Sequence, residues 1–166
     1  MAYCLIEDRR VPLESIADER LCRLLEYWRG KRAGRPMPAR TDIDPFELRE
    51  HLGRLNLLDV DGPNLFRFRL YGSSVTNPDV MDMTGRTTQD YADTGFGAVV
   101  TRHYQMCVDE KAPVYHEVIG TLREAPYEFV RLIMPLSSDG TNVDMLFASP
   151  QPLRVSIELP SGGILP

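Results

Sequence analysis

The sequence predicts a single α+β domain, in which a helical N-terminal part precedes an antiparallel sheet. Three patterns indicate this fold class. Residues 15–33 carry an apolar stripe with the period of a helix, the period changes to about two residues at Leu55, and the last third reads as a meander of three strands. The chain has 166 residues, which is long enough for one domain with short appendages and a buried core.

Residues 15–33 are predicted to form an amphipathic helix. Ser15 and Asp18 resemble a capping box, and Gly34 stands where a glycine commonly ends a helix. Such an apolar face must be covered, either by the protein's own sheet or by another chain. We expect its larger members to pair with a second copy or a partner, and these are Leu21, Leu24, Leu25 and Trp28, which follow Ala17 on the stripe.

The segment after this helix is basic and interrupted by prolines. Residues 29–40 contain five cationic side chains and no acidic one. A solvated polar linker explains this composition, and the alternative is a contact with RNA, phosphate or an acidic partner. A second, short helix is expected to begin at Asp44, with Pro45 at its first position, and to end near Gly53.

Alternating residues and turn signals place the other elements. Strands are expected at 55–60, 65–71, 114–122, 127–136 and 143–149, with a helix at 96–109 and one or two short helical turns within 71–95. The chain is thereby divided into an N-terminal arm (1–14), a helical extension (15–54), a core (55–150) and a C-terminal tail (151–166). The tail is expected to be mobile or docked as an arm.

Composition excludes several classes of protein. The net charge of -5 argues against a general nucleic-acid binder, because such binding requires clustered cations. No apolar run is long enough to span a membrane, and the N-terminus does not resemble a secretory signal. Cys4, Cys22 and Cys107 are widely spaced and form no CxxC motif, which indicates a reducing compartment, so we expect a cytoplasmic protein.

No motif for catalysis or metal binding is complete. The turn after residue 70 lacks the second glycine of a nucleophile elbow, because Val75 and Thr76 follow Ser74. His103 and Cys107 lie four residues apart on one helix face, a spacing that could serve a metal but more commonly marks packed core residues. We therefore predict no catalytic residues, no metal site and no enzymatic activity.

Arg131 is the most unusual polar residue in the pattern. It lies between Val130 and Leu132 in an otherwise apolar strand, where a lone cation needs a partner. One interpretation is a salt bridge with Glu117 or Glu128. The other is an anchor for an anionic ligand or partner.

The order of these elements resembles a PAS domain. The segment "MTGRTTQDY" is similar to the region after the short PAS helices, and "YEFVRLIMPLSSDGTNVDMLFAS" is similar to the last PAS hairpin. The pattern Pro-x-Arg-x-Asp-Ile-Asp-Pro at residues 38–45 resembles a subfamily of stand-alone PAS proteins from alphaproteobacteria, formerly a domain of unknown function. Together these motifs cover residues 15–150.

The resemblance implies a five-stranded antiparallel sheet with helices on one face, plus the N-terminal amphipathic helix. It also implies a regulatory sensor or interaction module that forms a homodimer through that helix, contacts an unidentified signalling protein, and binds a small molecule between sheet and helices. The residues expected to line that cavity are Phe68, Tyr71, Phe96, His103, Tyr104, Cys107, Phe129, Arg131 and Met145. No cofactor is obligatory, since no flavin-reactive cysteine motif is present and the position of His103 relative to Pro113 does not clearly fit haem-binding PAS domains.

Three alternatives stay open at this point. The chain could be a pure interaction scaffold whose core is filled. It could be a small α+β enzyme, which would require His103, Arg131 and an acid to converge in a pocket. It could also bind RNA or phosphate through residues 29–40.

Overall fold

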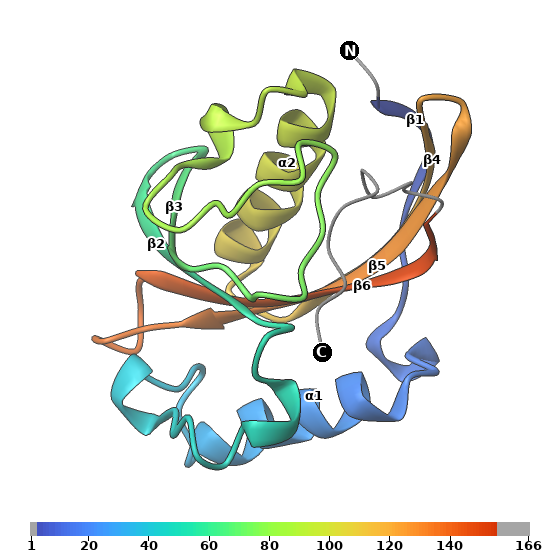
Figure 1. Ribbon diagram of the computed structural model, residues 1–166. Coiled ribbons are helices and arrows are strands. Elements are labelled where there is room, and N and C mark those ends of the chain that lie inside the picture. Colours follow the sequence, from blue (N-terminus) through green and yellow to red (C-terminus); the bar gives the residue numbers. More distant parts are fainter. Residues whose placement is uncertain (1–2, 156–166) are drawn as a thin grey trace.

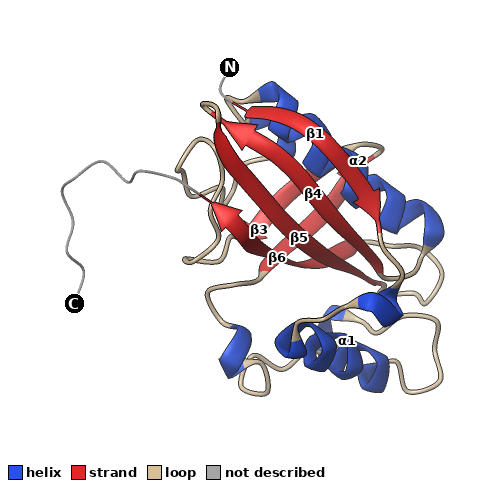
Figure 2. Cartoon of the chain, turned by 90° about the vertical axis from the view of Figure 1, so that its right-hand side faces the viewer, coloured by secondary structure: helices blue, strands red, loops and turns tan. Residues whose placement is uncertain are grey.

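The computed structural model describes residues 3–155, and in this part of the chain six strands form one antiparallel sheet (Figure 1). The strands are β1 (Tyr3–Arg10), β2 (Asn56–Gly62), β3 (Leu65–Leu70), β4 (Val114–Leu122), β5 (Ala125–Leu136) and β6 (Met145–Val155). Their order across the sheet is β1-β4-β5-β6-β2-β3, so the first and third strands form the two edges. Figure 2 shows the four strands β1, β4, β5 and β6 side by side.

Two α-helices cover this sheet from different sides. Helix α2 (Thr94–Glu110) and the segment 71–93 lie on one face, and α1 (Glu19–Lys31) lies on the other side of β5 and β6 (Figure 1). Both odd and even residues of β5 are buried from position 129 to position 136, as expected of a strand covered on both faces. Among the described residues, no helix combines the length and the apolar character needed to cross a membrane.

The α+β class and the antiparallel sheet are confirmed, but the sheet has six strands where the sequence predicts five. The additional strand, β1, comes from the segment expected to be an N-terminal arm, and it pairs with β4. Most of its side chains are exposed, so the alternating apolar pattern that predicts a strand is missing. At the other end, β6 continues to Val155, and the rest of the expected tail lies outside the described residues.

The second helix expected from Asp44 to Gly53 is absent. This segment forms turns and one 3-10 turn at Arg49–His51. Its conformation is set by contacts with α1, because the Asp44 backbone N–H donates to the Tyr27 hydroxyl at 2.9 Å and that hydroxyl donates to Glu47 at 2.8 Å. Tertiary contacts therefore override the local helix signals.

Helix α1 begins one turn later than its expected cap. Asp18, not Ser15, is the N-cap, and its carboxylate accepts hydrogen bonds from the backbone N–H groups of Arg20 at 2.9 Å and Leu21 at 3.0 Å. A side-chain acceptor at this position satisfies the free N–H groups of the first turn.

The apolar face of α1 is covered by the chain's own sheet. Leu21, Leu24, Leu25 and Trp28 are all buried, and the Trp28 indole donates to the carbonyl of Pro135 in β5 at 2.8 Å. The expectation that these four residues pair with a second copy is therefore corrected, since their surface is already used inside one chain.

The basic stretch is also largely neutralised from within. Arg29 pairs with Glu26, Lys31 with Glu47 and Arg35 with Asp42. Arg32 lies over the Trp28 ring, 5.5 Å from its centroid. This pairing leaves little free positive charge for a nucleic acid.

The burial of α1 generates a stability prediction. Leu24 is fully buried, so Leu24→Ala should lower the free energy of unfolding by about 2–5 kcal/mol through lost packing and a residual cavity. Glu26→Ala, on the exposed side of the same helix, should change it by less than about 0.5 kcal/mol. Urea unfolding of the three proteins measures both effects, and equal stabilities would show that α1 does not pack on the sheet.

Candidate functional site

The space between α2 and the sheet is filled by aromatic side chains. Phe68 packs edge-on against Tyr71, with ring centroids 5.1 Å apart, and against Tyr104 at 6.3 Å. Phe96 lies 5.9 Å from Phe129 in the same layer. The cavity that adjoins Phe96, Phe129 and Arg131 measures only about 20 Å³. Such a volume holds about one water molecule, whereas pockets for drug-sized ligands are roughly 300–1,000 Å³.

Most residues expected to line a ligand cavity are instead packed core. Eight of them are buried: Phe68, Tyr71, Phe96, His103, Tyr104, Cys107, Phe129 and Arg131. The Cys107 thiol donates to the carbonyl of Ala112 at 3.4 Å, and burial raises the pKa of this thiol well above its ordinary value. Met145 is half-buried at the start of β6.

Arg131 is the buried charge in this layer. Its side chain leaves β5 toward α2, and the residue is 3% exposed. One terminal nitrogen, Nη1, donates to Nδ1 of His103 at 3.0 Å, while Nε has no hydrogen-bond partner among the described residues. The guanidinium also lies 4.9 Å from the centroid of Phe129 and 5.7 Å from that of Tyr104, within the range of cation–π attraction. The expected salt bridge with Glu117 or Glu128 is not formed.

These contacts determine the tautomer of His103. An arginine can only donate, so Nδ1 of His103 is the acceptor and carries no proton. Its other nitrogen, Nε2, lies 2.8 Å from Oδ1 of Asp8 and therefore donates. Burial lowers the pKa of His103 to about 3. The hydrogen bond to Asp8 acts in the opposite direction, and the charge of Arg131 adds a smaller lowering. His103 is thus a neutral relay between a buried cation and a carboxylate.

Asp8, on β1, completes the network. Its Oδ1 also accepts from Nδ1 of His116 on β4 at 3.1 Å, and its Oδ2 accepts from Arg102. Burial alone would raise the pKa of Asp8, but the hydrogen bonds from His103 and Arg102 outweigh it and hold this pKa well below its ordinary value. The rings of His103 and His116 stack with centroids 3.8 Å apart. We call Asp8, Arg102, His103, His116 and Arg131 the Asp8 network.

The donor set of this network is a poor fit to a metal ion or a haem. Asp8, His103 and His116 place three potential ligand atoms within 4.8 Å of one another. However, Nε2 of His103 and Nδ1 of His116 already bond to Oδ1 of Asp8, and Arg102 and Arg131 place two positive charges beside them. An iron ligand at His103 would have to break one of its two hydrogen bonds, in a space filled by side chains.

The same geometry bears on the enzymatic alternative. His103, Arg131 and an acid do converge, as that alternative requires, but the adjoining cavity of about 20 Å³ has no room for a substrate. A histidine with a pKa of about 3 is a weak base, and both of its nitrogens are engaged. The network is therefore suited to holding elements together and not to proton transfer.

Three members of the network, Asp8, Arg102 and His116, escaped the sequence analysis. His116 has the same strand parity as the apolar Val114 and Val118, so its inward orientation could have been inferred. Asp8 carried no such signal, because β1 shows no apolar alternation. The pairing of β1 with β4 places Asp8 opposite Val118, close to His116.

Comparison with protein families supports the fold assignment. A family model described as a PAS domain matches residues 17–148. A search of curated proteins found no match. A search of solved structures found no match either. The matched range contains both α-helices, strands β2 to β5 and the start of β6, whereas β1 and Asp8 precede it.

The Asp8 network predicts sensitivity to acid. Unfolded His103 titrates near its ordinary value of 6.5, but folded His103 does so at about 3. Between these values the unfolded chain binds a proton that the folded protein does not, so the free energy of unfolding falls as the pH is lowered from 6.5. This residue contributes a slope of up to about 1.4 kcal/mol per pH unit. Burial lowers the pKa of His116 as well, and its contribution has the same sign.

Urea unfolding across this pH range measures the slope, and His103→Gln is the informative variant. Glutamine can donate to Asp8 and accept from Arg131 without titrating. The slope of the unfolding free energy with pH should therefore correspond to about one fewer proton bound on unfolding. An unchanged slope would contradict a neutral His103. If this variant does not fold, the ring nitrogen chemical shifts of His103 in the unmodified protein provide the same test.

Proposed function

Because the chain belongs to the PAS domain family, we propose that it is a regulatory interaction module with a filled core, which acts by contact with another protein. PAS domains are generally sensory or interaction modules. The observation that carries the proposal is the aromatic filling between α2 and the sheet, where the cavity beside Arg131 is about 20 Å³. A groove of about 690 Å³ exists on the outer side of α2, but it is an open surface lined by residues such as Thr101 and Gln105.

An exposed aromatic residue supports a partner surface. Phe46 is 80% exposed, although Ile43, three residues before it, and Leu48, two residues after it, are buried and anchor the segment. Its backbone N–H donates to the Asp44 carboxylate at 2.9 Å. A large apolar side chain presented on a fixed turn binds a partner with little loss of conformational entropy, and such residues are common anchors of interfaces. The partner would offer an apolar pocket for an aromatic ring.

Self-association through α1 is not part of this proposal, because the apolar face of that helix is buried in one chain. We propose a different protein as the partner. Cys4, Cys22 and Cys107 are free thiols, which is consistent with a reducing compartment, and we place the module in the cytoplasm.

The filled core predicts that the purified protein has the mass of the chain alone. Native mass spectrometry should give the chain without any non-covalently bound organic molecule of cofactor size, because the cavity beside Arg131 is too small for one. The denatured mass of the same sample is the reference. A reproducible difference of several hundred daltons would contradict the filled-core proposal and favour a ligand-binding sensor.

The role of Phe46 is tested by matched substitutions. Phe46→Ser should reduce capture of the partner from an extract of the producing organism by about ten-fold or more, as expected for an interface anchor. Leu70→Ser removes an apolar side chain that is also exposed but lies on β3, and it should leave capture unchanged. Both variants should keep the melting temperature of the unmodified protein. Equal capture by all three proteins would exclude the Phe46 turn as the contact.

A further inference from the structure

A separate pocket lies where the start of α1 meets β6. It measures about 150 Å³, and its walls come from four segments that are distant in the sequence. The lining residues are Arg20, Leu21, His51, Arg54, Ser74, Ser149, Pro150, Gln151 and Pro152. We call it the outer pocket. Its size suits a small ion or metabolite fragment and is well below that of a cofactor site.

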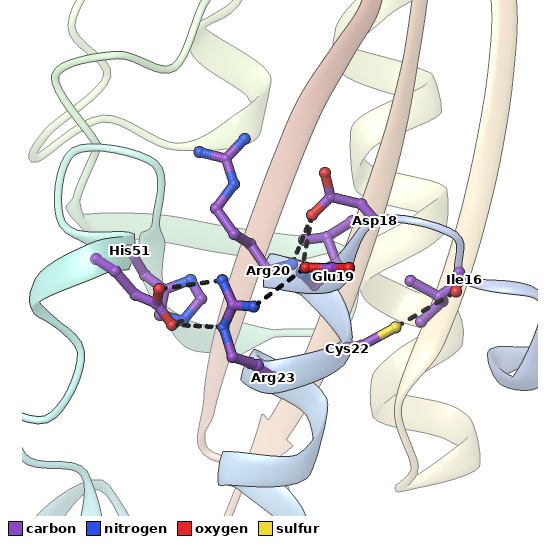
Figure 3. A network of polar contacts seen from close by, with 9 residues as sticks. Ile16, Asp18, Glu19, Arg20, Cys22, Arg23 and His51 are labelled. Atoms are coloured by element: carbon purple, nitrogen blue, oxygen red, sulfur yellow. Dashed lines mark hydrogen bonds and ion pairs between the residues drawn. The ribbon is translucent and has the colours of Figure 1, made fainter.

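Two arginines at this pocket have no counter-ion in contact. Neither the guanidinium of Arg20 nor that of Arg54 makes a hydrogen bond or an ion pair with the described residues. Figure 3 shows Arg20 extending away from the contacts at the start of α1. Arg23, one turn further along, is by contrast held by Glu50 through Nε at 2.9 Å.

The acidic groups nearby are already engaged. Asp18 caps α1, and its other oxygen accepts from the side chain of Gln151 at 2.7 Å. Glu50 holds Arg23, and Glu19 lies 3.7 Å from the same arginine. Burial lowers the pKa of His51, so this side chain is uncharged near neutral pH. Arg20 and Arg54 thus line the pocket without a hydrogen-bonded counter-ion. The carboxylates nearby are bonded to other groups.

From this arrangement we propose that the outer pocket binds a small oxyanion, such as a phosphate or a carboxylate group. Arginine guanidinium groups match the geometry of these oxyanions and can donate two parallel hydrogen bonds to them. The hydroxyl of Ser74 and the second N–H of the Gln151 amide, whose first N–H donates to Asp18, also line the pocket and add neutral donors. A bound oxyanion would join α1, the loop before β2, the loop after β3, and β6.

The experiment uses inorganic phosphate and succinate as probes, with the full chain at constant ionic strength. Each is titrated while backbone amide NMR signals are followed. We expect saturable one-site binding of at least one probe, with the largest shifts near Arg20, Arg54 and Ser74. The tighter probe identifies the ligand class as phosphorylated or carboxylate-bearing. Saturable binding of neither probe would overturn the proposal.

Matched variants separate a built site from general charge attraction. Arg20→Gln combined with Arg54→Gln should weaken binding by about ten-fold or more, since each arginine supplies charge-assisted hydrogen bonds. Arg49→Gln removes an exposed arginine that lies close to Arg54 in the sequence but outside the pocket, and it should preserve the affinity. Equal weakening by both sets would overturn the assignment. Neither guanidinium supports the fold through a hydrogen bond, so all variants should keep the unmodified amide spectrum outside the pocket.

Discussion

The arrangement of this domain depends on the hydrogen bonds that the Asp8 carboxylate accepts. This carboxylate is the negative charge nearest in the network to the buried Arg131, and His103 connects the two by hydrogen bonds of 2.8 and 3.0 Å. A buried guanidinium without such compensation is strongly destabilising. The same carboxylate joins β1 to α2 and β4, so electrostatic compensation and the attachment of the edge strand are one structural requirement.

The aromatic layer explains why family membership alone does not define what this PAS domain binds. Phe68, Tyr71, Tyr91, Phe96 and Tyr104 contact one another edge-on and occupy the volume that a ligand would need. Interiors packed in this way have few voids larger than a water molecule. A fold that elsewhere can enclose a cavity is here closed by side-chain volume, which moves the functional question to the surface.

The sequence could predict the elements whose signals are local. The strand at 114–122 has the bounds of β4, because Pro113 precedes a run rich in β-branched and aromatic residues, which favour strands. The apolar stripe of α1 likewise showed that this face must be covered. It did not show by what, because packing on the chain's own sheet and pairing with a second copy require the same apolar pattern in the sequence. The expected helix after Asp44 was wrong because the Tyr27 hydroxyl of α1 bonds to both Asp44 and Glu47 and so fixes that segment from outside. Asp8 could not be predicted as part of a site, since its partners His103 and His116 are brought near it only by the pairing of β1 with β4.

The outer pocket and the small cavity beside Arg131 share a wall. Ser74, Pro150, Gln151 and Pro152 line both the outer pocket and the small cavity beside Arg131. In the sheet, Pro150 lies opposite Arg131 and Gln151 lies opposite Val130. Prolines have no backbone N–H, so this stretch of β6 has fewer donors to fix it in the sheet. An oxyanion held by Arg20 and Arg54 would therefore act on the strand segment that also borders the unpaired Nε of Arg131. A surface ligand could in this way influence the buried network without entering the core.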